Sequence, residues 1–209
     1  MTATVQPATL EPSAKPVLDR AALDTIFLAA RSHNGWTDAP VSDAEIKALY
    51  DLVKYGPTSA NTQPARFVFV RSAAAKARLA PALAEGNRKA LAAPVIAIIG
   101  YDTAFYDKIP QVFPHNPGFR DLFVNNPGMV EPHAFRNSSL QGAYLIIAAR
   151  ALGLDVGPMS GFDAAKVDAE FFPGGTVKTN FIAALGHGDH TKVMERLPRL
   201  AFEEAAQIV

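Results

Sequence analysis

The chain has 209 residues, of which 49% are hydrophobic, with 20 basic and 20 acidic side chains and no cysteine. A globular chain of this length buries a substantial core, and its balanced charge gives no electrostatic case for nucleic acid or an anionic membrane surface. The lack of cysteine excludes disulfides, thiolate metal sites and cysteine nucleophiles.

The N-terminal residues 1–16 are rich in Ala, Thr and Pro and show no periodicity. We therefore expect a flexible N-terminal arm, followed by a single domain over 17–209. No basic segment precedes an apolar run, and no apolar stretch is long enough to span a bilayer. These features predict a cytoplasmic protein without a signal peptide and without a membrane partner.

The first half of the chain begins with two predicted helices. Apolar residues recur at helical spacing between positions 18 and 29, which predicts the first helix. Ser42 and Glu45 form a capping box that begins the second helix, and Gly56 ends it. The β-branched and aromatic residues at 67–70 then predict a buried strand.

Four more segments follow along the chain. Ser72 is expected to cap a helix that runs to about Ala84, and "APVIAIIGY" predicts a second buried strand over 93–101. Five prolines fall within 102–133, so we expect a long loop there, which is usually functional or mobile. A strong apolar stripe predicts a helix over 134–152.

The last part of the chain mixes both kinds of element. Residues 153–163 predict a short strand, a turn and a helix capped by Asp163, and residues 179–185 predict a last strand. The tail over 191–209 shows no clear element before its acidic end. Because helices and strands alternate without strict βαβ order, the α+β class is favoured.

The sequence lacks the motifs that are typical of hydrolases, metal sites and nucleotide-binding loops. The chain has no G-x-S-x-G elbow, no Walker A loop and no G-x-G-x-x-G turn. His187 and His190 flank Asp189, but a turn histidine with a backbone contact is commoner than a metal ligand. We therefore predict no metal site.

Three features have two interpretations each when only the local sequence is considered. Gly157 and Gly161 could cap a helix and turn a corner, or could let backbone N–H groups lie against a planar ligand. Arg31 could complement a helix dipole or bind an anion. The pair Arg196 and Arg199 could be solvated or could form a second anion clamp.

Four segments together resemble the FMN-dependent nitroreductase family. "PTSANTQP" before a strand is similar to its signature loop, "RSHNGW" to a flavin-binding segment, "GLDVGPMSGFD" to a glycine-rich segment and "RLP" to a C-terminal phosphate-contacting stretch. They occur in family order and span nearly the whole chain. The wider pattern, with "HNGW" and "AFRNSSLQGAY", is closest to the branch that contains malonic semialdehyde reductase.

This resemblance implies a fold and an assembly. We expect a nitroreductase-like α+β fold with a mixed sheet flanked by helices, in an interlocked homodimer whose active sites are shared between subunits. It implies FMN as cofactor, with NADH or NADPH as a transient electron donor, and no catalytic side chain because the flavin itself transfers the hydride. Part of 102–133 is expected to cover the flavin.

The resemblance also implies the cofactor-binding residues. One subunit would supply Arg31, Ser32, His33, Asn87, Lys89, Pro158, Met159, Ser160, Gly161 and Arg196. The partner would supply Pro57, Thr58, Ser59 and Asn61. Gly35 stands where many members have a basic residue, which gives Arg196 more weight as the phosphate contact.

For the reaction, the resemblance favours reduction of malonic semialdehyde to 3-hydroxypropanoate. A general nitro, quinone or enone reductase is the alternative among enzymes. A flavin-binding electron-transfer protein with a protein acceptor is the alternative from a different class.

Overall fold

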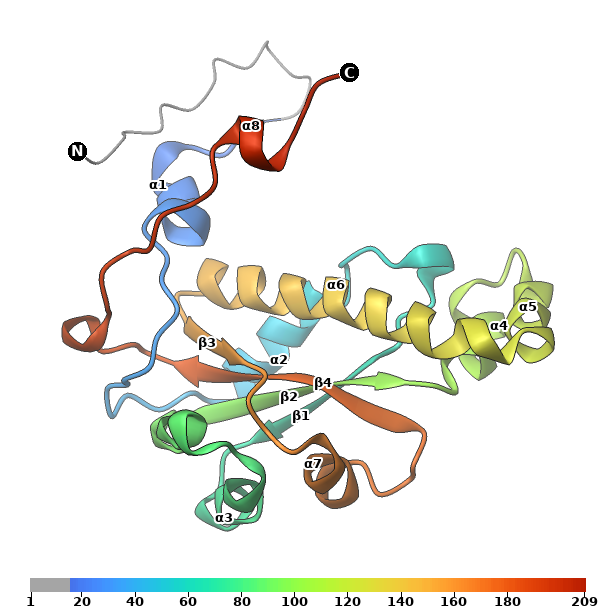
Figure 1. The fold of residues 1–209 in the computed structure, drawn as a ribbon, viewed down its shortest axis with the longest axis horizontal. Coiled ribbons are helices and arrows are strands. Elements are labelled where there is room, and N and C mark those ends of the chain that lie inside the picture. The colour runs from blue at the N-terminus through green and yellow to red at the C-terminus, as the bar shows by residue number, and fades with distance from the viewer. Residues whose placement is uncertain (1–15) are drawn as a thin grey trace.

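Four strands form one antiparallel sheet in the computed structural model, which describes residues 16–209 (Figure 1). They are β1 (Ala65–Val70), β2 (Val95–Asp102), β3 (Asp155–Met159) and β4 (Val177–Gly186), in the order β1-β2-β4-β3. The arm predicted over 1–16 lies outside the described residues, except for its last position. The α+β class is confirmed.

The prediction of a mixed sheet is wrong, because all three neighbouring strand pairs are antiparallel. The parallel component is reduced to an isolated bridge between Ser32 and Val156. There the backbone N–H of His33 donates to the carbonyl of Val156 over 3.1 Å, and the chain then turns away before a ladder can form. The segment around Ser32 is thus fixed beside β3 without being a strand.

Helices cover both faces of the sheet (Figure 1). Helices α2 (Asp43–Val53) and α6 (Val130–Ala151) lie over one face, and α3 (Ala73–Leu79) and α7 (Ala164–Phe171) lie over the other. Strand β2 is therefore buried along its whole length. Alternate side chains of the strand enter the two cores, with Ile99 packed in the α6 layer and Ile98 in the α7 layer.

The predicted helix starts are largely confirmed. Ser42 and Glu45 form the capping box of α2, Ser72 caps α3, and Asp163 caps α7 through its side chain. The first predicted helix is shorter, since α1 (Arg20–Leu23) passes into a π-helical turn over Asp24–Leu28. None of the helices within 16–209 combines the length and apolar character needed to cross a membrane.

The long loop predicted over 102–133 is mostly helical. It contains α4 (Ile109–Val112) and α5 (Arg120–Asn125), and α6 begins already at Val130. Three of its prolines lie in the first turn of a short helix, where a missing N–H costs nothing. Phe105 and Phe123 are completely or almost completely buried, and their rings lie 4.8 Å apart, so this segment has a small core of its own.

The C-terminal tail has little regular structure apart from the short helix α8 (Phe202–Ala205) near its end. It runs back beside α1, so residues near both ends of the described chain lie together (Figure 1). Large apolar side chains remain exposed on it, namely Met194, Leu197, Leu200 and Phe202.

Candidate functional site

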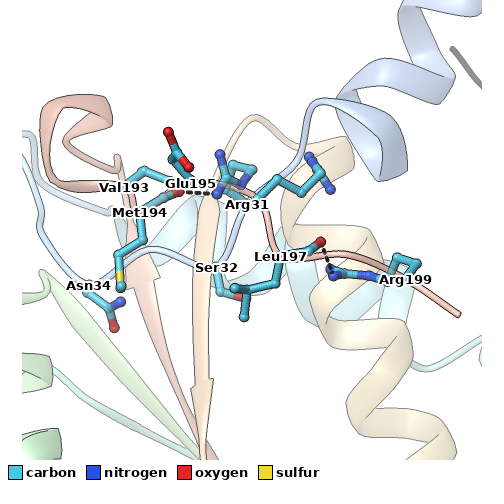
Figure 2. Close-up of a pocket in the computed structure, with 9 residues that line it drawn as sticks. Arg31, Ser32, Asn34, Val193, Met194, Glu195, Leu197 and Arg199 are labelled. Atoms are coloured by element: carbon cyan, nitrogen blue, oxygen red, sulfur yellow. Dashed lines mark hydrogen bonds between the residues drawn. The ribbon is translucent and has the colours of Figure 1, made fainter. Parts of the chain in front are cut away.

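A cavity of about 220 Å³ lies between the segment after the first helix and the C-terminal tail (Figure 2). Arg31, Ser32 and Asn34 form one side of it, and residues 193–197 with Arg199 form the other. Three of the predicted cofactor-binding residues, Arg31, Ser32 and Arg196, are therefore brought together.

The cavity concentrates positive charge. Its three guanidinium groups donate to backbone carbonyls: Arg31 to Met194, Arg196 to Leu28 at 2.8 Å and Ala30 at 3.0 Å, and Arg199 to Leu197 at 2.9 Å and Pro198 at 3.1 Å. None of the three forms an ion pair with a carboxylate among residues 16–209. Glu195 is the acidic residue in the lining. The arrangement is suited to an anion with two charges.

The turn after β3 presents backbone donors. The backbone N–H groups of Ser160 and Gly161 donate to no residue within 16–209. Asn87 donates its side-chain amide to the carbonyl of Gly161 over 2.9 Å, and a Cβ on Gly161 would lie 2.4 Å from that amide nitrogen. A side chain at 161 would therefore displace the Asn87 amide from this hydrogen bond, and the turn leaves two N–H donors available.

Gly157 has a different explanation. A Cβ at this position would lie 2.3 Å from the backbone carbonyl of His33. The glycine therefore lets β3 approach the segment that contains Arg31 and Ser32. This packing requirement holds the segment that lines one side of the cavity against β3.

The side chain of His33 does not line the cavity. The ring is buried against Gly188 and lies 5.1 Å from the ring of His190. Its Nε2 is 3.1 Å from Asp155 Oδ1, which is within ion-pair distance but not aligned for a hydrogen bond. Burial lowers the pKa of His33, which outweighs the opposing effect of Asp155. His33 reaches the cavity region only through its backbone.

The loop over 57–63 has a strained backbone. Ala60, Asn61 and Gln63 have φ values of 49°, 51° and 42°, in the left-handed region that non-glycine residues rarely adopt. Thr58 stabilises the turn, because its hydroxyl accepts from the N–H of Gln63 over 3.1 Å. Strain of this kind persists only where surrounding contacts fix the conformation, and it is concentrated at functional sites.

Three polar side chains of α6 fix this loop. Asn137 accepts from the N–H of Ser59, Gln141 accepts from the N–H of Ala65, and His133 contacts the hydroxyl of Thr62. Sequence reasoning did not identify them as site residues. The sequence did contain a signal for them: these polar residues lie four positions apart, on a helix face that otherwise enters the core.

The two groups of predicted residues lie toward opposite ends of α6. Asn137 holds the loop over 57–63, whereas Arg150 in the last turn donates to the carbonyl of Ile26, close to Arg31. Thirteen helical residues separate these two positions, a distance of about 20 Å. No hydrogen bond within the described part of the chain joins the two groups.

Two further predictions concern Lys89 and metal binding. Lys89 is exposed on the 3-10 segment that also contains Asn87, and no hydrogen bond or ion pair connects it to the described residues. Among residues 16–209, no three histidine, aspartate or glutamate side chains are grouped as metal ligands.

A helix-covered antiparallel sheet, an arginine-lined cavity and a strained polar loop place this chain in the nitroreductase-like class of α+β proteins. It belongs to the nitroreductase family, which residues 28–173 match. A provisionally named NADH dehydrogenase/NAD(P)H nitroreductase of Burkholderia lata is 58% identical over 192 residues, covering 91% of this chain and 98% of the relative. A protein of Stenotrophomonas maltophilia with the same provisional name is 59% identical, covering 91% and 97%.

Solved structures of the family share the fold at low sequence identity. A provisionally assigned nitroreductase of Exiguobacterium sibiricum, solved in complex with FMN, is 19% identical with a TM-score of 0.82 and covers 94% of this chain and 100% of its own. The enone reductase CLA-ER, from gut-bacterial fatty acid saturation metabolism, is 19% identical with a TM-score of 0.79, covering 92% and 100%.

Proposed function

We propose that this protein is an FMN-dependent NAD(P)H oxidoreductase that works as a homodimer. The observation that supports this most strongly is the arginine-lined cavity between the segment around Arg31 and the C-terminal tail. Two backbone N–H groups after β3, at Ser160 and Gly161, supply further donors. The names of the two relatives at 58% and 59% identity support the use of a reduced nicotinamide.

The residues present fit FMN. Arg31, Arg196 and Arg199 lack carboxylate partners within the described chain, so a phosphate dianion would neutralise charge that the protein leaves unbalanced. The free N–H groups at 160 and 161 would donate to polar edge atoms of the flavin ring, with Pro158 and Met159 beside it. Asn87 would act indirectly by holding Gly161 in place.

The separation of the two residue groups along α6 supports the dimer. Pro57, Thr58, Ser59 and Asn61 do not line the arginine cavity of their own chain, and they would reach the cofactor from the partner subunit. Exposed apolar side chains on α6, such as Leu140 and Tyr144, and on the C-terminal tail offer surface for such an interface. We expect an interface of more than about 2,000 Å², as in permanent assemblies.

For the reaction, FMN supplies hydride transfer, taking electrons from NADH or NADPH and passing them to an acceptor in a ping-pong sequence. The favoured acceptor is malonic semialdehyde. Overall, one NAD(P)H, one proton and one aldehyde give NAD(P)⁺ and 3-hydroxypropanoate. The chain's own residues bind the cofactor, orient it and limit access of water.

A second candidate function has direct support in the names of the relatives. Both are named NAD(P)H nitroreductases, which favours nitro compounds as acceptors. An electron-transfer role with a protein acceptor is the alternative outside this enzyme class.

Purified protein tests the proposal in two stages. A yellow dimer with a flavin spectrum and stoichiometric FMN is expected, and a colourless protein that does not take up added FMN would contradict it. Oxidation of NADH and NADPH is then followed with malonic semialdehyde, a nitroaromatic and a quinone. Faster turnover of the semialdehyde supports the favoured acceptor, whereas turnover of nitro compounds alone favours the second candidate.

A further inference from the structure

A second pocket, of about 130 Å³, lies between the strained loop, the start of β1 and α4. It is a polar pocket without an acidic side chain in its lining. The residues that define its chemistry are Arg66, Lys108, Gln63, Gln111, Gln141 and Tyr50.

Its two cations differ in what they already bind. Arg66 donates to Asp102 over 2.6 Å and to the carbonyls of Gln63 and Ala65, so its charge is neutralised within the chain. The exposed ammonium group of Lys108 has no ion-pair partner among residues 16–209. The pocket therefore has one uncompensated positive charge, with side-chain amides around it.

The pocket adjoins the residues that the proposed function places at the cofactor. Thr62 and Gln63 line it and belong to the strained loop. Asn61 in the same loop donates its side-chain amide to the carbonyl of Val112, at the end of α4, over 2.7 Å. The segment that contains Lys108 is thus joined directly to the loop.

The volume limits the ligand. An apolar cavity of about 150 Å³ in another protein accommodates benzene, so 130 Å³ corresponds to about six non-hydrogen atoms. A three-carbon acid with an aldehyde group has that size. A carboxylate is the group that an unpaired ammonium and neighbouring amides recognise.

We propose that this pocket binds the carboxylate of a short acidic aldehyde, with Lys108 as the specificity-determining residue. This inference rests on the proposed function, because it assigns the acceptor class of that same site. A neutral nitroaromatic or quinone gains nothing from Lys108, so the pocket separates the two candidate acceptor classes.

The test uses the FMN-loaded dimer with Lys108→Gln, and Lys166→Gln as the matched control on the opposite face of the sheet. For Lys108→Gln we expect KM for malonic semialdehyde to rise about tenfold or more, with kcat little changed. KM for propanal, which has no carboxylate, stays the same. Lys108→Arg retains most of the affinity, and the control behaves as the parent.

A binding measurement without turnover completes the test. Malonate, which cannot be reduced here, is titrated into the oxidised dimer by calorimetry, and Lys108→Gln should weaken its binding by the same factor. Equal changes for semialdehyde and propanal would overturn the assignment, as would unchanged KM and malonate affinity. If the parent dimer reduces no acceptor but binds malonate through Lys108, the proposed function fails and the anion pocket stands.

Discussion

The side chain of Asn137, which is 2% exposed in α6, accepts a hydrogen bond from the backbone N–H of Ser59 over 2.8 Å. The same side chain donates to the carbonyl of His133 one turn earlier over 2.9 Å. Asn137 therefore uses both ends of its amide, one to fix its own orientation and one to hold the strained loop. This contact links the conformation of the loop over 57–63 to the longest helix of the fold.

Replacing Asn137 by alanine should destabilise the protein. The N–H of Ser59 would lose its acceptor, and an unsatisfied, partly buried donor costs about 1–3 kcal/mol. We expect a lower midpoint of urea unfolding at fixed protein concentration, since a dimer's stability depends on concentration. Asn126→Ala, which removes an exposed amide that donates to the carbonyl four residues earlier, should lose less. Equal losses in the two variants would show that the contact with Ser59 is not what matters.

Arg196 offers a test of the cavity. If its guanidinium contacts the phosphate, Arg196→Ala should weaken FMN binding roughly ten- to a hundredfold, the effect of one charge-assisted hydrogen bond. Riboflavin, which lacks the phosphate, should bind the variant and the parent about equally. Fluorescence quenching with both ligands isolates the phosphate contribution.

Arg196 also has a structural role, which a control variant separates from phosphate binding. Arg196 also donates to the carbonyls of Leu28 and Ala30, so its removal alters the end of the first helical segment. Loss of affinity for both ligands would indicate this structural role rather than a phosphate contact. Arg78→Ala, on α3 and paired with Glu170, removes an exposed arginine away from the cavity and should change neither affinity.

Much of the fold was predictable because its signals are local. The capping boxes, the apolar stripes and the β-branched runs located α2, α6 and the strands to within a few residues. The prediction of a long loop over 102–133 was wrong, and the reason is also local. Proline was read there as a loop former, although at Pro110, Pro117 and Pro127 it begins short helices.

Features that depend on contacts between distant parts of the chain were harder to predict from the sequence. The direction of strand pairing is set by packing across the sheet, so a mixed sheet could not be distinguished from an antiparallel one. Arg196 meets Leu28 across 168 residues of sequence, and only the family resemblance suggested that these segments share a site. Lys108 belongs to no motif, and its relation to Gln63 becomes visible only when the pocket is formed.

The exposed face of α6 gives a prediction about assembly. Leu140 is 46% exposed although it belongs to the central helix, which suits a side chain buried by a partner subunit. Leu140→Asp should shift the protein toward monomer, because an unpaired carboxylate would be buried in the interface. The sedimentation coefficient and the FMN content per chain should fall together, since the loop over 57–63 would no longer reach the partner's cavity.

Ala165→Asp supplies the control for this prediction. It adds the same charge to α7, on the opposite face of the sheet, at another exposed helix position. This variant should remain dimeric and yellow. A stable monomer of the Leu140 variant that keeps its FMN would contradict the shared site.

The last prediction concerns pH. The pKa of His33 is lowered, chiefly by burial, so the folded state favours the neutral ring more than the unfolded state does. Between the folded and the unfolded pKa, the unfolded chain binds more protons, and stability therefore falls as pH decreases below the ordinary value of 6.5. His133 contributes in the same direction, because burial lowers its pKa as well.

His33→Gln should reduce this dependence without abolishing it, since His133 remains. The free energy of urea unfolding, measured from pH 8 to pH 5, should fall less steeply in the variant than in the parent. A parent whose stability stays constant over this range would show that His33 is not held neutral. A variant with the parent's slope would assign the effect to His133 alone.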